Sequence, residues 1–134
     1  MVVDSSFMLS AFMPDEVSDV TETLLGDAVE AGVVVPSHWH CEVANAFNVA
    51  IRRKRIAIGD RDGALKEIAT FGVEIDPETN DHIWGATLRL ADANGLTVYD
   101  AAYLELAQRR RVPLLTLDRP LADAARKAGI EVLP

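Results

Sequence analysis

The sequence lacks the long apolar runs and paired cysteines that mark membrane and disulfide-bonded proteins. Its apolar stretches, such as Val33–Val35 and Pro113–Leu115, are far shorter than the roughly 18 residues that a membrane-spanning helix needs. The one cysteine, Cys41, has no partner for an internal disulfide, which fits a reducing compartment. No basic segment followed by an apolar stretch opens the chain, so we expect no signal peptide and a cytoplasmic location.

Glycine-rich phosphate loops are also missing. No Gly-x-Gly-x-x-Gly or Walker-type motif occurs, so binding of nucleotide phosphates by a backbone loop is not supported. Linkers, repeats and low-complexity segments are absent as well. The 134 residues are 49% hydrophobic and 25% charged, which is the composition of an ordinary globular protein. Their number is close to the commonest domain size, so we expect one domain over residues 1–134.

Positive charge is in short supply. The chain has 13 Lys and Arg against 21 Asp and Glu, for a formal net charge of −8. A field of this sign repels phosphate and argues against a protein that coats nucleic acid. An enzyme that acts on nucleic acid remains compatible with it, provided that the attraction is local.

Short apolar strands alternate with helical segments along the chain. Strands are expected at Met1–Val3, Val33–Val35, Val73–Ile75, Leu114–Leu117 and Ile130–Leu133. Helices are expected over Ser5–Met13, Asp15–Ala31, from a Ser37 cap to the basic cluster at 52–55, and over Asp60–Phe71, Pro77–Ala93, Tyr99–Arg111 and Arg119–Ala128. This rhythm predicts an α/β fold with a mostly parallel sheet between two helical layers. Ligand sites of such folds form beyond the carboxyl ends of the strands.

Four carboxylates are candidates for that edge of the sheet. Asp4 and Asp118 directly follow apolar strands and precede helices, and Asp100 stands at the start of a helix. Each of these three also suits an ordinary helix cap or dipole partner, so none is diagnostic alone. Glu42 is different, because helical spacing puts it on the flank of an apolar stripe, where an unpaired charge is costly.

Four acids that converge would raise one another's pKa unless a cation lay between them. All-oxygen donors suit Mg²⁺, or Mn²⁺ as its substitute, better than zinc. The pattern therefore predicts a divalent metal site that hydrolyses phosphodiesters. His38, His40 and Cys41 do not indicate zinc, since residues two apart on a helix point in different directions. We expect solvated or capping imidazoles and a small buried thiol.

Four short motifs, taken in order, resemble those of PIN-domain ribonucleases, and most closely the VapC toxins of bacterial and archaeal toxin–antitoxin systems. The matching segments span the chain and are Val2–Ser6, Glu42–Asn45, Leu96–Leu104 and Leu115–Asp118. The resemblance implies a PIN-like three-layer α/β/α sandwich and a metal-dependent endoribonuclease. It also implies an acidic pocket of Asp4, Glu42, Asp100 and Asp118, with Asp4 and Asp100 as direct metal ligands.

The resemblance also concerns supporting residues and partners. It implies supporting polar roles for Ser5 or Ser6, Asn45 and Thr116. It further implies an RNA substrate, a homodimer and a hetero-oligomer with a cognate antitoxin that neutralises the toxin. Among the cations, Arg109, Arg110 and Arg119 are candidates for holding RNA phosphate, although the first two end a helix, where basic side chains are ordinary dipole partners.

Two other functions fit parts of the sequence. A phosphatase or phosphotransferase would use Asp4 as a nucleophile and would need a lysine at the edge of the sheet. Lys66 and Lys127 are expected within helices, where they do not meet that need. A non-catalytic α/β binding module is the third interpretation, but it would not need four acids.

Overall fold

A five-stranded parallel sheet forms the centre of the computed structural model, which describes residues 1–134. The strands lie in the order β3-β2-β1-β4-β5. They are β1 (Val2–Val3), β2 (Val34–Val35), β3 (Glu74–Ile75), β4 (Leu114–Leu115) and β5 (Val132–Leu133). The register pairs Val3 with Leu115, so the residues that follow β1 and β4 emerge at the same level of the sheet. The expected parallel α/β sheet is confirmed.

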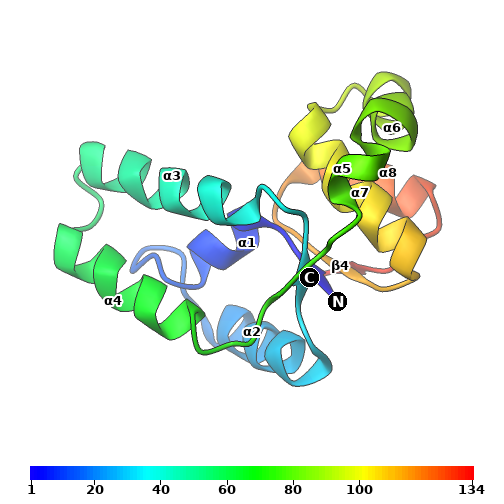
Figure 1. The fold of residues 1–134 in the computed structure, drawn as a ribbon. Coiled ribbons are helices and arrows are strands. Elements are labelled where there is room, and N and C mark those ends of the chain that lie inside the picture. The colour runs from blue at the N-terminus through cyan, green and yellow to red at the C-terminus, as the bar shows by residue number, and fades with distance from the viewer.

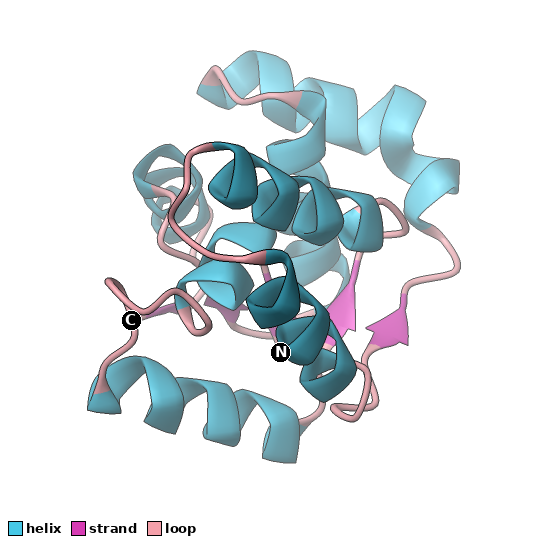
Figure 2. Cartoon of the chain, turned by 90° about the vertical axis from the view of Figure 1, so that its left-hand side faces the viewer, coloured by secondary structure: helices cyan, strands magenta, loops and turns pink.

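The helices form two groups on opposite sides of this sheet (Figure 1). The first group is α1 (Ser5–Ser10), α2 (Asp19–Ala31), α3 (Trp39–Arg52) and α4 (Ile58–Ile68). The second group is α5 (Thr79–His82), the π-helix η1 (Ile83–Thr87), α6 (Leu88–Asn94), α7 (Val98–Arg110) and α8 (Arg119–Lys127). The first half of the chain adds strands on one side of β1, in the order β2 and then β3, and the second half adds β4 and β5 on the other side. Crossovers between parallel strands are right-handed, so connections that run in opposite directions along the sheet place their helices on opposite faces. Figure 2 shows the short strands enclosed by these helices.

Helix α7 is the most deeply buried helix. Seven consecutive residues, Ala101–Ala107, are buried, because α7 packs on β1 and β4 and is covered by α6 and α8. A helix enclosed on nearly all sides is expected to be apolar around its circumference, and only Glu105 in this stretch carries a charge. Burial of α7 fixes the position of its first turn, which carries Asp100, at the edge of the sheet.

Several boundaries differ from the sequence prediction for identifiable reasons. Helix α2 begins at Asp19 because Ser18 and Thr21 form a reciprocal capping box. Ser37 does not cap α3; its backbone N–H donates to the Thr79 hydroxyl at 3.2 Å. The single helix expected over Pro77–Ala93 is divided into α5, η1 and α6, where the backbone widens into a π-turn.

Two further observations concern the surface. Cys41 is exposed on α3, so the expectation of a buried thiol is wrong. No helix is long and apolar enough to cross a membrane.

Candidate active site

Asp4 is a buried acid at the end of β1. Its side chain is the N-cap of α1 and accepts a hydrogen bond from the Phe7 N–H at 2.9 Å. The Ser6 hydroxyl lies 2.8 and 2.9 Å from its two oxygens, and the Thr116 hydroxyl donates at 2.6 Å. The residue is only 3% exposed, and this burial raises the pKa of Asp4 to about 6, although its hydrogen bonds act in the opposite direction. The carboxylate is thus firmly oriented but costly to ionise.

Thr116 links Asp4 to the next acid along the edge. Its hydroxyl donates to Asp4 and accepts the backbone N–H of Asp118 at 3.0 Å. Asp118 caps α8 by accepting the Leu121 N–H at 2.8 Å through Oδ1. Its Oδ2 receives no hydrogen bond from the protein, so this oxygen is free to bind a ligand. Both expected caps, Asp4 and Asp118, are therefore confirmed as caps.

Asp100 occupies the first turn of α7 rather than its cap. Thr97 is the cap, and its hydroxyl accepts the Asp100 N–H at 3.1 Å. Burial raises the pKa of Asp100, and the nearby charges of Asp118 and Glu42 raise it further. The charges of Asp118 and Glu42 are therefore each near enough to Asp100 to raise its pKa.

Glu42 comes to the same place from the first turn of α3. Its Oε2 accepts hydrogen bonds from the Ser5 hydroxyl at 3.0 Å and the Tyr103 hydroxyl at 2.6 Å. Burial, together with the charge of Glu42, raises the pKa of Tyr103 far above its usual range, so the phenol remains a donor. The other oxygen, Oε1, faces Nε2 of His38 at 3.5 Å. The expectation that Glu42 needs a partner is confirmed.

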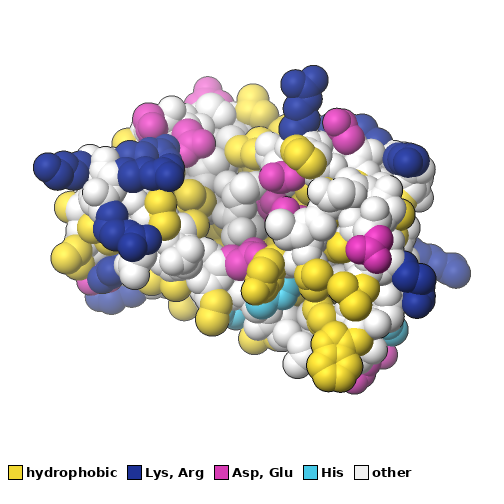
Figure 3. Space-filling view, turned by 90° about the horizontal axis from the view of Figure 1, so that it is seen from above, with side chains coloured by type: hydrophobic (Ala, Val, Ile, Leu, Met, Phe, Trp, Pro, Cys, Tyr) yellow, Lys and Arg dark blue, Asp and Glu magenta, His cyan; other side chains and the backbone are white.

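The four acids therefore come from four separate segments, and Figure 3 shows acidic and histidine side chains near the middle of one face. No three Asp, Glu, His or Cys side chains lie close enough, as they stand, to enclose a metal ion. The donor chemistry nevertheless fits a hard divalent cation, because all four side chains offer oxygen. Burial and neighbouring negative charge raise the pKa values of Asp4 and Asp100. A positive ion beside them would offset both effects by stabilising the ionised carboxylates.

Residues 1–127 match the family model of the PIN domain. The chain belongs to the PIN-domain family. Ribonuclease VapC3 from Pyrobaculum aerophilum is 32% identical over 123 residues, which are 92% of this chain and 92% of that relative. This PIN domain is thus homologous to a VapC ribonuclease along nearly all of its length, and the resemblance drawn from the four motifs is confirmed.

Solved structures share the fold of this PIN domain. PAE2754 from Pyrobaculum aerophilum superposes with a TM-score of 0.69 at 22% identity, covering 98% of this chain and 82% of its own. VapC20 from Mycobacterium tuberculosis, a toxin that cleaves the sarcin-ricin loop, gives 0.67 at 17% identity, covering 99% and 98%. FitAcB from Neisseria gonorrhoeae gives 0.63 at 13% identity, covering 99% and 96%. Similarity at these identities establishes the architecture.

The polar residues expected to support the PIN-domain site divide into two groups. Ser5 and Ser6 hold Glu42 and Asp4, and Thr116 holds Asp4. Asn45 is exposed on α3, and its side chain makes no hydrogen bond within the protein.

Sequence reasoning missed Tyr103 and misjudged His38. Tyr103 lies three residues after Asp100, on the same side of α7, which was the available indication that it faces the site. His38 lies four residues before Glu42, and its side chain is only 19% exposed. It stands at the N-cap position of α3 without a side-chain cap bond, and its ring packs edge-on against Tyr99 and Tyr103 instead of being solvated.

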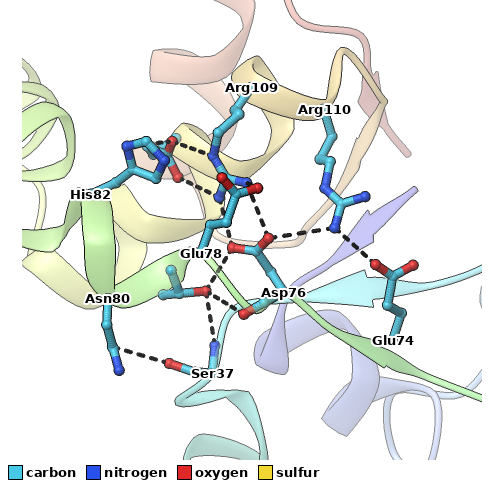
Figure 4. A network of polar contacts seen from close by, with 10 residues as sticks. Ser37, Glu74, Asp76, Glu78, Asn80, His82, Arg109 and Arg110 are labelled. Carbon is cyan, nitrogen blue, oxygen red and sulfur yellow. Dashed lines mark hydrogen bonds and ion pairs between the residues drawn. The ribbon is translucent and has the colours of Figure 1, made fainter.

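Arg109 and Arg110 belong to an ion-pair network (Figure 4). Arg109 donates through Nη2 and Nη1 to the two oxygens of buried Asp76, at 2.7 and 3.0 Å, and through Nε to Glu105 at 2.8 Å. Arg110 donates to Glu74 at 2.8 Å. Acids from neighbouring segments already pair with these guanidinium groups, so the structure gives Arg109 and Arg110 a structural role, and their contact with RNA stays a prediction. Arg119 alone of the three candidates is exposed and makes no ion pair.

The alternative in which Asp4 is a phosphoryl-accepting nucleophile lacks its required lysine. Both oxygens of Asp4 already accept hydrogen bonds, and the groups that set its pKa include no cation. Lys66 lies within α4, and Lys127 is the last residue of α8, about 13 Å along the helix from Asp118. The site therefore resembles a set of oxygen ligands more than a nucleophile with a phosphate-binding cation.

Proposed function

We propose that this chain, as a single PIN domain over residues 1–134, is a Mg²⁺-dependent endoribonuclease and the toxin of a toxin–antitoxin pair. The observation that carries the proposal is the convergence of Asp4, Glu42, Asp100 and Asp118 at one edge of the sheet, with a raised pKa at two of them. Homology to ribonuclease VapC3 over 92% of the chain supports RNA as the substrate.

Asp4 and Asp100 are the proposed primary metal ligands, and Asp118 and Glu42 complete the set. A bound Mg²⁺, or Mn²⁺ in its place, supplies Lewis-acid activation of water and neutralises charge at the scissile phosphate. The protein's own contribution is orientation. Thr116 and the Phe7 N–H hold the Asp4 carboxylate in one orientation, in which it would serve as a ligand of the ion.

The hydroxyls around Glu42 have a similar role. Ser5 and Tyr103 both donate to Oε2, which leaves Oε1, facing Nε2 of His38, as the oxygen available to a ligand. The phenolic proton stays on Tyr103 because its pKa is raised far above neutrality, so this residue holds Glu42 and does not act as a base. No histidine or lysine base is required in this scheme, because the ion held by these acids would supply the activation of water.

Arg119 is the proposed phosphate contact beside the acids. It is exposed at the first position of α8, next to Asp118, and no acidic side chain pairs with it. A cation in this position supplies the local attraction that an acidic protein needs if it is to bind RNA near its site.

The proposed partners are a cognate antitoxin and a second copy of the chain. Co-purification with the product of an adjacent small open reading frame, and loss of RNA cleavage in that complex, is the expected result. Purification of a fully active toxin in the presence of an excess of that product would contradict the antitoxin proposal.

The activity is tested by mapping new RNA ends after brief induction of the parent and of Asp100→Asn. Asp123→Asn is the matched control, since Asp123 is an exposed acid of α8 whose nearest cation, Arg126, lies 3.5 Å away. New ends are expected with the parent and with Asp123→Asn, and not with Asp100→Asn. Equal cleavage by a folded Asp100→Asn protein would refute the assignment.

A further inference from the structure

His38 carries a nitrogen that the structure leaves without a partner. Its Nε2 is fully buried and makes no hydrogen bond. The nearest acidic atom is Oε1 of Glu42, at 3.5 Å, a separation too long for a good hydrogen bond. Burying a polar atom without a partner costs about 1–3 kcal/mol, so this arrangement calls for a ligand.

Neighbouring side chains fix both His38 and Glu42. The rings of Tyr99 and Tyr103 stand edge-on to the imidazole, with centroids 5.6 and 5.5 Å away. Ser5 and Tyr103 occupy Oε2 of Glu42, so Oε1 is the oxygen left for a ligand. The two atoms without hydrogen-bond partners, Nε2 and Oε1, therefore face each other from consecutive turns.

Their separation suits two ligands of one ion. Two donors that each lie about 2.1 Å from an octahedral ion, at right angles to one another, are about 3 Å apart. The observed 3.5 Å needs only a few tenths of an ångström of closure. His38 is also near enough to Asp100 to influence the pKa of that carboxyl, so the imidazole lies beside the acids already assigned to the site.

We propose that Nε2 of His38 is a ligand of the divalent ion in the acidic site, adjacent to Oε1 of Glu42. The inference rests on the proposed function and adds a nitrogen to an otherwise all-oxygen site. Imidazole suits transition metals, whereas Mg²⁺ prefers oxygen, so the consequence is selectivity for Mn²⁺ over Mg²⁺.

The direct test is three-pulse electron spin-echo envelope modulation of the Mn²⁺-loaded protein, which detects a coordinated ¹⁴N. The parent is expected to show this modulation, and His38→Phe is expected to lose it while keeping an aromatic ring between the two tyrosines. His40→Phe is the matched control, because His40 is exposed two residues further along the chain and its ring packs against Trp39. It is expected to keep the modulation.

Calorimetry with MnCl₂ and MgCl₂ gives the second readout. His38→Phe is expected to weaken Mn²⁺ binding by about tenfold or more, the loss typical of disturbed metal sites, and to leave Mg²⁺ binding nearly unchanged. His38→Gln, which offers an oxygen in place of the nitrogen, is expected to lose the ¹⁴N modulation while recovering part of the affinity. Thermal melts of each variant verify folding.

The outcomes separate this inference from the proposed function. A parent that binds Mn²⁺ without ¹⁴N modulation, or a His38→Phe protein that retains the modulation, overturns the nitrogen ligand. If that same parent cuts RNA, the proposed ribonuclease stands. A parent that binds neither ion and cuts no RNA overturns both.

Discussion

Replacing Arg109 with methionine tests whether this arginine stabilises the fold instead of binding RNA. The Asp76 side chain is 0% exposed, and its carboxylate relies on two hydrogen bonds from Arg109, at 2.7 and 3.0 Å, and one from Thr79 at 2.9 Å. Burial alone would raise the pKa of Asp76, but Arg109 and Thr79 bring it to about 2. In Arg109→Met the buried carboxylate loses its two short hydrogen bonds to a cation, and only Arg110, 3.5 Å from Oδ1, remains beside it.

The magnitude follows from the same geometry. A pKa of Asp76 about 2 units below the ordinary value means that the folded protein stabilises the ionised carboxylate over the protonated acid by roughly 2–3 kcal/mol. Breaking a buried ion pair by removing one partner destabilises a protein by about 3–5 kcal/mol. We therefore expect Arg109→Met to lose about 3 kcal/mol of unfolding free energy at pH 7, a large part of the stability of a small domain.

The effect has a defined pH dependence. Because the folded pKa of Asp76 lies below its unfolded value, its contribution is complete above about pH 4 and is lost as the pH falls toward 2. In Arg109→Met, protonation of Asp76 at low pH removes the cost of burying an unpaired carboxylate. The difference in stability between parent and Arg109→Met should therefore narrow steadily on acidification.

Urea unfolding monitored by tryptophan fluorescence measures this difference, since Trp39 is buried and reports on the core. Arg126→Met is the control, because the pair that Arg126 makes with Asp123 is exposed and 3.5 Å long, and its loss should be within about 0.5 kcal/mol. A stability of Arg109→Met within about 1 kcal/mol of the parent, together with weaker RNA binding, would refute the structural role and restore Arg109 as a phosphate contact.

Three further substitutions probe the edge of the sheet. Asp4→Asn should abolish cleavage yet stabilise the metal-free protein by about 1–2 kcal/mol above pH 6 in thermal melts. Burial raises the pKa of Asp4 to about 6, so ionisation of this carboxyl opposes folding. The gain in stability should vanish below pH 4, where the carboxyl is protonated in the folded and the unfolded protein. Thr116→Val should cost about 2 kcal/mol in urea unfolding, since both Asp4 and the Asp118 N–H lose a partner, whereas an unchanged midpoint would contradict the bridging role. Arg119→Glu should weaken RNA binding by an inactive protein and lower its salt slope by about 1 in fluorescence anisotropy, while Lys127→Glu should not; equal effects would exclude a local contact.

Local pattern was enough to predict the fold class and the acidic residues. Strand and helix alternation predicted the parallel sheet, because each apolar run that must be buried on both faces is short and is followed by a helical segment. Asp4 and Asp118 were predicted at the edge of the sheet for the same reason, since each directly follows a strand. Boundaries were less accurate, as with the division of residues 77–93, because a π-turn depends on packing against α7.

Pairings between distant segments were decided only by the tertiary structure. Asp76 pairs with Arg109 and Glu74 pairs with Arg110, although more than thirty residues of sequence separate each acid from its arginine. These pairings determine which cations are left without an acidic partner. Glu42 of α3 and Tyr103 of α7, on opposite sides of the sheet, meet only after the chain has folded. The sequence by itself determined which residues carry the acidic oxygens, because strand ends and helix starts are local. The tertiary structure decided how each charge is partnered, because burial and hydrogen bonding depend on contacts across the whole chain.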